Sequence, residues 1–187
     1  MPITADHIRE TLGEYLDVHP EEKERLACIS ALLDAPPTDL TSRKEFRGHA
    51  TAGAILADPT GRVLHIRHLA LNRWLLPGGH LEPGDAGLLA AALRELAEET
   101  GIAAGAVVPA GRCPVHIDVH PIPANPDKGE PEHRHFDFRF LFRTSADIGE
   151  LQTEEVTAAA WRPAGTIEDA VLRGRVLDAL CERPVTE

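Results

Sequence analysis

The sequence has little positive charge and lacks long apolar segments. Its 187 residues carry 19 Lys and Arg against 30 Asp and Glu, which gives a formal net charge of −11 at pH 7. Nucleic acids and anionic membrane surfaces are bound by clustered Lys and Arg, and the sequence has no basic run. We therefore expect no nucleic acid and no membrane among its partners. The polar N-terminus predicts no signal peptide and a cytoplasmic location.

Cysteine and aromatic residues are also scarce. The three cysteines, Cys28, Cys113 and Cys181, are far apart and lack the paired spacing of a zinc site or a disulfide framework. We expect them to be reduced thiols. Aromatic residues make up 4% of the chain, so few side chains can stack on a base, chiefly Trp74 and Trp161. The chain length suits one globular domain with an appendage.

The stretch from Gly78 to Ile102 contains the clearest helix signal in the sequence. Asp85 can cap the start of the helix, and Gly101 can end it in a left-handed conformation. Between these two residues, leucines recur at the three- to four-residue spacing of one helix face; these are Leu89, Leu93 and Leu96.

Three glutamates occupy one turn of this predicted helix. Glu95, Glu98 and Glu99 stand at positions i, i+3 and i+4, so their carboxylates project from one side. Carboxylates this close repel one another, and Arg94 offsets only part of that repulsion. A divalent cation would offset the rest.

The run Arg94 to Ile102, RELAEETGI, resembles the signature of the Nudix hydrolases. The segments 48–51 and 74–80 also look like the strand and loop that precede this signature in the family. The resemblance implies an α+β fold, an α/β/α sandwich in which a mixed β-sheet lies between helices. We expect an N-terminal helical extension at residues 1–45 and a Nudix hydrolase domain at residues 46–187.

The front half of the signature departs from the family pattern, in which a glycine, five residues, a glutamate and seven residues precede the arginine. Five residues after Gly79 the chain has Asp85 instead of glutamate, and eight residues separate Asp85 from Arg94. We interpret the extra residue as part of the loop, which leaves the register of the three glutamates intact. We interpret Asp85 as a helix cap, and its participation in the site stays open.

Residues 4–33 read as two amphipathic helices. The first carries Ile8, Leu12, Tyr15 and Leu16 on one face, and the second begins at Pro20. Neither helix contains a convergent polar cluster. We expect these helices to cover the main domain, and a homodimer contact is a second role for them.

Several strands are predicted from alternating patterns. Residues 50–57 and 62–68 form a hairpin through the turn 58–61, and residues 73–76 form a short strand. Two further strands are expected at residues 112–120 and 133–143. One face of the last strand is core because it carries four phenylalanines: Phe136, Phe138, Phe140 and Phe142.

The opposite face of these last two strands collects histidine and aspartate, which become cross-strand neighbours if the strands pair. This face is either a solvated sheet surface or a surface that contacts substrate or a further metal ion. Its side chains, together with His80 beside the glycines, are the candidates for substrate binding: His80, His116, Asp118, His133, His135 and Asp137.

The connection from Pro121 to Glu132 is long and rich in proline, which keeps it extended and stiff. We interpret it either as a flap that covers the substrate or as an inert surface loop. As a flap, it would supply from Glu130 or Glu132 the additional carboxylate that Nudix enzymes often bring from outside their signature. Glu154 and Glu155 are the rival candidates.

The resemblance implies a Mg²⁺- or Mn²⁺-dependent hydrolase that cleaves the pyrophosphate linkage of a nucleoside diphosphate joined to another moiety. Both ions prefer hard oxygen ligands, and the implied ligands are Glu95, Glu98, Glu99 and the carbonyl of Gly79. Glu98 is among the most favoured ligands and, with Glu95 and Arg94, forms the catalytic set. Glu95 serves as ligand or base, and Arg94 orients the carboxylates.

The sequence leaves the substrate and two rival interpretations open. The tyrosine that marks enzymes for dinucleoside polyphosphates is missing downstream, since the only tyrosine is Tyr15. One rival interpretation is a catalytically silent Nudix-like sensor that binds a ligand without turnover. The other places a transition metal on the histidine and aspartate face and treats the signature as vestigial.

Overall fold

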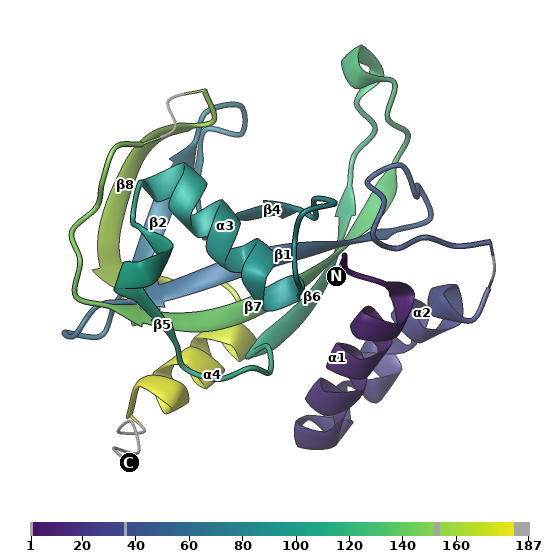
Figure 1. Ribbon diagram of the computed structural model, residues 1–187, viewed down its shortest axis with the longest axis horizontal. Coiled ribbons are helices and arrows are strands. Elements are labelled where there is room, and N and C mark those ends of the chain that lie inside the picture. Colours follow the sequence, from purple (N-terminus) through teal and green to yellow (C-terminus); the bar gives the residue numbers. More distant parts are fainter. Residues whose placement is uncertain (1, 36, 152–153, 182–187) are drawn as a thin grey trace.

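The computed structural model describes residues 2–35, 37–151 and 154–181, and it places a mixed β-sheet between helices (Figure 1). The strands are β1 (His49–Ala57), β2 (Arg62–His68), β3 (Arg73–Leu75), β4 (Gly78–His80), β5 (Val107–Pro109), β6 (His116–Ile122), β7 (His133–Thr144) and β8 (Val156–Pro163). The α-helices are α1 (Ala5–Val18), α2 (Lys23–Leu33), α3 (Leu88–Thr100) and α4 (Ala170–Cys181).

The sheet is built around the parallel pair β1 and β7. The main strand order is β3-β2-β1-β7-β5, while β4 pairs with β1, β6 with β7 and β8 with β2. Strands β1 and β7 run parallel from the pair His49 and His135 to the pair Ala57 and Arg143, and the other pairings are antiparallel. This mixed arrangement confirms the fold predicted from the sequence.

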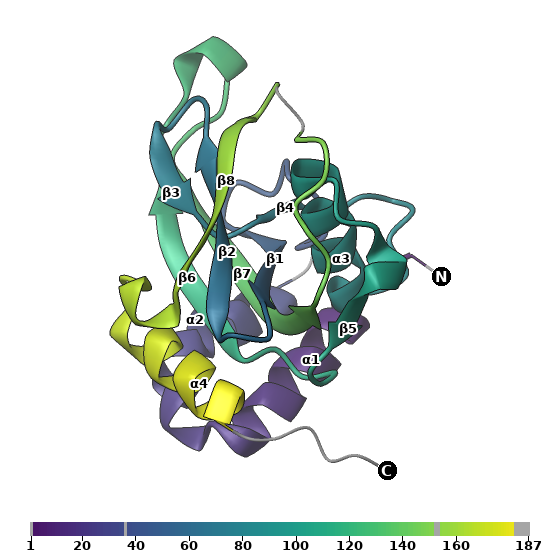
Figure 2. The same cartoon turned by 90° about the vertical axis from the view of Figure 1, so that its left-hand side faces the viewer.

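Helices cover both faces of the sheet (Figure 2). On one face, α3 packs against the alternate small residues of β1 and the four phenylalanines of β7, and these belong to one buried cluster. On the other face, α4 covers only the end of the sheet near Ile55 and Leu141, through Leu172 and Val176. The rest of that second face carries the polar side chains that line the site.

The predicted hairpin and the buried phenylalanine face are confirmed. Asp58 closes the turn between β1 and β2 by accepting hydrogen bonds from the backbone N–H groups of Thr60 and Arg62, and Gly61 adopts a φ of 79°. The strand predicted from residue 112 was wrong at its start, since β6 begins at His116. Strand β5 was missed because three residues are too few to show an alternating pattern.

The two predicted N-terminal helices are present, and a 3₁₀ turn at Pro20–Glu22 separates them. Ile8, Tyr15 and Leu26 belong to the same buried cluster as the phenylalanine face of the sheet. The helices therefore pack as part of the main core. The domain boundary at residue 45 and the homodimer contact stay predictions. Of the described helices, none has the length and apolarity needed to cross a membrane.

Candidate active site

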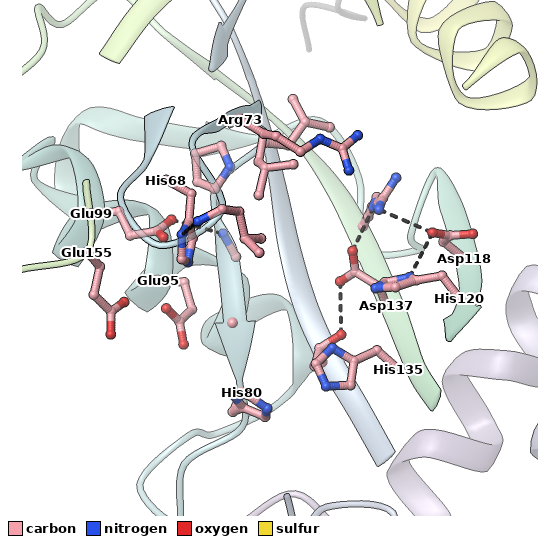
Figure 3. A pocket seen from close by; sticks show the side chains of 18 of the residues that line it. His68, Arg73, His80, Glu95, Glu99, Asp118, His120, His135, Asp137 and Glu155 are labelled. Carbon is pink, nitrogen blue, oxygen red and sulfur yellow. Dashed lines mark hydrogen bonds and ion pairs between the residues drawn. The ribbon is translucent and has the colours of Figure 1, made fainter. Parts of the chain in front are cut away.

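A large cavity opens between the glycine segment, the C-terminal part of α3 and the polar face of β6 and β7. Its volume is about 1050 Å³. Glu95, Glu99 and Glu155 lie on one side, and Asp118, His135 and Asp137 lie on the other, as Figure 3 shows. The cavity is thus bounded by carboxylates on one side and by mixed charged groups on the other.

Two glycines allow the acidic helix to approach the sheet. Strand β4 pairs with β1, and the N–H of Gly78 donates a hydrogen bond of 3.0 Å to Glu99 Oε2. A Cβ atom at Gly79 would stand 2.6 Å from Glu95 Oε1, so glycine is what allows that carboxylate to occupy this position. Gly78 itself has a φ of 155° and lies against the backbone of β1. Glycine is therefore required here both for conformation and for close packing.

Burial shifts the proton affinity of two glutamates. Burial raises the pKa of Glu95 to about 7, with Arg94 opposing and the carboxylate of Glu98 adding to the shift. Burial likewise raises the pKa of Glu99 to about 8, against the hydrogen bond from Gly78. A bound cation would reverse this cost, because it favours the charged carboxylates. These hard oxygen donors fit a divalent ion such as Mg²⁺.

Asp85 is part of this arrangement and does not cap the helix, so that prediction was wrong. Helix α3 begins only at Leu88, and Asp85 instead makes a bidentate pair with Arg94 at 2.9 and 3.1 Å. Its second oxygen also accepts a hydrogen bond from the N–H of Glu82. The cap position of α3 is instead Gly87, because the loop continues for two residues beyond Asp85 before the helix starts.

Arg94 connects this loop to the glutamates. Its guanidinium donates to the carbonyl of His80 at 2.9 Å, to Glu95 Oε1 at 3.1 Å and to Glu98 Oε2 at 3.0 Å. The negative partners raise the pKa of Arg94, with the hydrogen bond to Asp85 as the largest cause. Five of its hydrogen bonds therefore hold the acidic turn and the glycine segment in one geometry.

The three glutamates are not gathered into one tight group. The side chain of Glu98 is 48% exposed and is turned toward Arg94. Glu99 is buried against the glycines, and the side chain of Glu95 beside them is 13% exposed. Glu155 lines the cavity on the same side, and its charge contributes to the raised pKa values of Glu95 and Glu99. Of the four candidates for an additional carboxylate, Glu155 thus lies at the site, and the other three are outside the described cavity lining: Glu130, Glu132 and Glu154.

The opposite side of the cavity is an ion-pair network. Arg139 donates to Asp137 at 2.7 Å and to Asp118 at 3.4 Å, and Asp118 also contacts His120 at 3.0 Å. The hydrogen bond to His120, together with the charge of Arg139, lowers the pKa of Asp118 to about 2. Thr51 on β1 donates to Asp137 at 3.2 Å. These contacts fix the carboxylates, so this face is not a loosely solvated surface.

The structure separates the six substrate-binding candidates. His80, Asp118, His135 and Asp137 line the cavity, whereas His116 and His133 lie outside its lining in the described chain. His116 is buried beneath α4, where Arg175 approaches its Nδ1 atom at 3.2 Å. The alternating pattern of β6 placed His116 on the same face as Asp118, but it could not show that α4 covers that end of the sheet.

Sequence reasoning missed the cationic residues of the cavity. Arg43, Arg73, Lys128 and Arg162 line it, in addition to Arg94 and Arg139. The cations lie on different elements and form no motif, so no local pattern signals them. Lys128 and Ile122 belong to the predicted flap, which connects β6 to β7 and projects from the sheet (Figure 1). Ile122 ends β6, and Lys128 lies in the short 3₁₀ turn at Pro126–Lys128. Part of that connection therefore contributes to the cavity.

Carboxylates held against a glycine segment beside a cavity are oxygen donors of the kind that a divalent cation prefers. The model of the NUDIX domain family matches residues 47–180 of this chain. The chain belongs to the Nudix hydrolase family. Nudix hydrolases generally use divalent metals.

Similar proteins agree with this assignment. A protein of Lactococcus lactis subsp. cremoris (strain MG1363) named "Probable DHNTP pyrophosphohydrolase" is 31% identical over 134 residues, which cover 72% of this chain and 77% of that protein. The E. coli dihydroneopterin triphosphate pyrophosphohydrolase superposes with a TM-score of 0.51 at 18% identity, over 69% of this chain and 92% of that one. A NUDIX-family hydrolase from Clostridium perfringens gives 0.52 at 17% identity, over 71% and 95%. The chain is an enzyme of the Nudix pyrophosphohydrolase type.

Proposed function

We propose that this chain hydrolyses a phosphoric anhydride linkage in a small molecule, with Mg²⁺ or Mn²⁺ held by Glu95, Glu98 and Glu99 and by the carbonyl of Gly79. The observation that carries the proposal is that the buried Glu99 and the partly buried Glu95 lie against Gly78 and Gly79. Buried carboxylates with raised pKa values are costly unless a cation or a proton neutralises them. When bound, the divalent ion supplies a Lewis acid that polarises a phosphoryl oxygen and acidifies water.

The residues of the chain supply binding, orientation and proton transfer. Cations on the cavity wall suit the charged oxygens of a pyrophosphate, and Arg73, Lys128 and Arg162 reach it from three different elements. Arg94 holds Glu95 and Glu98 in fixed positions. Glu95 serves either as a ligand or as the base that accepts a proton from water, since its pKa of about 7 suits proton transfer near neutral pH.

Two substrate classes are proposed. The first is a nucleoside diphosphate joined to another moiety, as the signature suggests. The second is dihydroneopterin triphosphate, and the names of the Lactococcus lactis and E. coli relatives support it. Both join a heterocycle to a chain of phosphates. Trp74 lines the cavity, and the guanidinium carbon of Arg162 lies 5.7 Å from the centroid of its ring. The indole ring of Trp74 offers a surface for stacking a heterocycle.

A turnover assay tests the proposal. The purified protein is incubated with Mg²⁺ or Mn²⁺ and either dihydroneopterin triphosphate or a panel of nucleoside diphosphate derivatives, and released phosphate or pyrophosphate is measured. We expect turnover of one substrate class and its loss in Glu98→Gln. Binding without turnover would favour the silent sensor instead. Activity that survives Glu98→Gln and is lost in His135→Ala would favour the vestigial signature.

A further inference from the structure

Five of the ten histidines in the chain come together at one edge of the cavity. The ring centroid of His49 lies 4.7 Å from that of His135, 5.0 Å from that of His133 and 5.2 Å from that of His80. His120 stacks edge-on against His135 at 5.6 Å. Strands β1, β4, β6 and β7 each contribute to this group, so it depends on the whole sheet.

The parallel pairing of β1 and β7 creates the centre of the group. His49 and His135 are direct partners in that register, and His133 lies two residues earlier on the same face of β7. The ligand atoms of His49, His133 and His135 all lie within 4.8 Å of one another. In the described part of the chain, these three form the only such group of potential metal ligands, and the group contains none of the glutamates.

Backbone carbonyls set the tautomers of two of these rings. His49 Nδ1 lies 3.3 Å from the carbonyl oxygen of Glu45, and His133 Nδ1 lies 2.8 Å from that of Pro131. A carbonyl oxygen only accepts hydrogen bonds, so each Nδ1 carries the proton. The lone pair is then on Nε2, and such a carbonyl contact is the usual support of a metal-binding histidine.

Two Nε2 atoms of this group lack a hydrogen-bond partner among the described residues. His49 Nε2 and His135 Nε2 are buried and, across the described residues, have no hydrogen-bond partner. The side chain of His49 is only 1% exposed. A buried polar nitrogen without a partner is unfavourable and rare, and a bound ion would satisfy both atoms.

We propose that His49, His133 and His135 bind one divalent transition-metal ion of the zinc class through their Nε2 atoms. Imidazole nitrogen favours Zn²⁺, Co²⁺ and Ni²⁺, whereas Mg²⁺ favours the oxygen ligands on the other side of the cavity. The site is independent of the proposed hydrolysis.

Such an ion would connect β1 to β7 beside the cavity. Three nitrogen ligands leave one position of a tetrahedral ion for water or for an atom of a bound molecule. His135 lines the cavity, so the ion would lie beside the space in which the substrate would bind. The glutamate site and the histidine site are therefore neighbours with different metal preferences.

Calorimetric titration with Zn²⁺ tests the site in the 187-residue chain, with excess Mg²⁺ present to occupy the carboxylates. We expect one Zn²⁺ ion per chain. His135→Asn should weaken Zn²⁺ binding by at least the roughly 10- to 100-fold seen when even an outer partner of a ligand is lost. The double variant Glu95→Gln/Glu98→Gln should bind Zn²⁺ normally, as should His19→Asn, which lies on the N-terminal extension.

X-ray absorption at the zinc edge supplies a test that needs no variant. The wild-type complex should show about three imidazole nitrogens at roughly 2.0–2.1 Å. This result decides the question if circular dichroism shows that His135→Asn fails to fold. The proposal is overturned if saturating Zn²⁺ does not bind, if the spectrum shows only oxygen ligands, or if the glutamate double variant abolishes binding while folded His135→Asn retains it.

Discussion

Asp85 illustrates how one side chain can replace another of different length. The family pattern has a glutamate near this position, and this chain has a shorter carboxylate that stands one residue further from Arg94. The loop compensates, since Asp85 still makes two charge-assisted hydrogen bonds to Arg94. Its side chain is 4% exposed, so this pair is shielded from water. The substitution therefore preserves the support of the acidic turn.

The stability of the fold should depend strongly on this pair. Asp85→Asn removes the charge and turns an amide N–H₂ toward the guanidinium, so Arg94 loses a buried partner. We expect the free energy of unfolding to fall by about 3 kcal/mol. Asp6→Asn is the matched control, because Asp6 pairs with Arg9 at the surface and should cost under about 1 kcal/mol. Urea unfolding measures both variants, and equal losses would contradict the argument.

Glu99 should destabilise the metal-free protein above neutral pH. Its pKa in the folded chain is about 8, above the ordinary value of 4.5, so the folded state retains a proton that the unfolded state releases. The contribution of Glu99 to the free energy of unfolding is fully present below pH 4.5, and it is lost as the pH rises toward 8. Glu99→Gln lacks this titration and can still accept the hydrogen bond from Gly78.

The variant and the wild type should therefore diverge with pH. In the presence of a chelator, Glu99→Gln should match the wild type near pH 5 and exceed it by up to a few kcal/mol at pH 9. Thermal unfolding across this pH range measures the difference. Glu10→Gln on the exposed surface of α1 controls for the loss of one negative charge. A constant difference between wild type and Glu99→Gln at all pH values would exclude the shifted pKa as the cause.

At the scale of elements, the contact between α3 and β4 depends on Gly79. A Cβ atom there would stand 2.6–2.7 Å from three atoms of the Glu95 carboxylate group, and this side chain would have to move. We expect Gly79→Ala to lower kcat by about 100-fold, as a displacement of about 1 Å in a site can do. The unfolding midpoint should change little, since a flexible side chain absorbs the clash.

Gly84→Ala is the control for this prediction. Gly84 lies in the loop that follows β4, and among the described residues none has a heavy atom within 4 Å of a Cβ built there. Its kcat should stay near that of the wild type. Steady-state kinetics with Mg²⁺ measures both variants. If Gly84→Ala loses as much activity as Gly79→Ala, loop flexibility rather than close contact limits catalysis.

The sequence predicted those elements that have a local period. Four phenylalanines at alternate positions identified β7, and the run RELAEETGI identified the end of α3. The role of Asp85 was missed because its partner lies nine residues away across a loop. The centre of the histidine group was missed because it depends on the parallel pairing of β1 and β7. Non-local pairing leaves no period in the sequence.

At the scale of the molecule, the N-terminal helices are tied to the sheet and to α4. Arg175 on α4 pairs with Glu22 at 3.0 Å and donates to the hydroxyl of Tyr15. Arg25 on α2 donates to the carbonyl oxygen of Ile117 on β6 at 2.6 Å. With Leu26 buried in the same cluster as the sheet, these contacts favour one cooperative unit.

Leu26→Ala should therefore destabilise the whole molecule. Leu26 is fully buried on α2, and its truncation should cost about 2–5 kcal/mol. Tryptophan fluorescence reports on the sheet through Trp74 and Trp161, whereas far-ultraviolet circular dichroism reports mainly on the helices. Both signals should shift to the same lower urea midpoint. Val18→Ala, at a site that is 65% exposed on α1, should leave both midpoints nearly unchanged. If the helical signal of Leu26→Ala were lost first while the fluorescence midpoint stayed at the wild-type value, the N-terminal helices would fold as an independent unit.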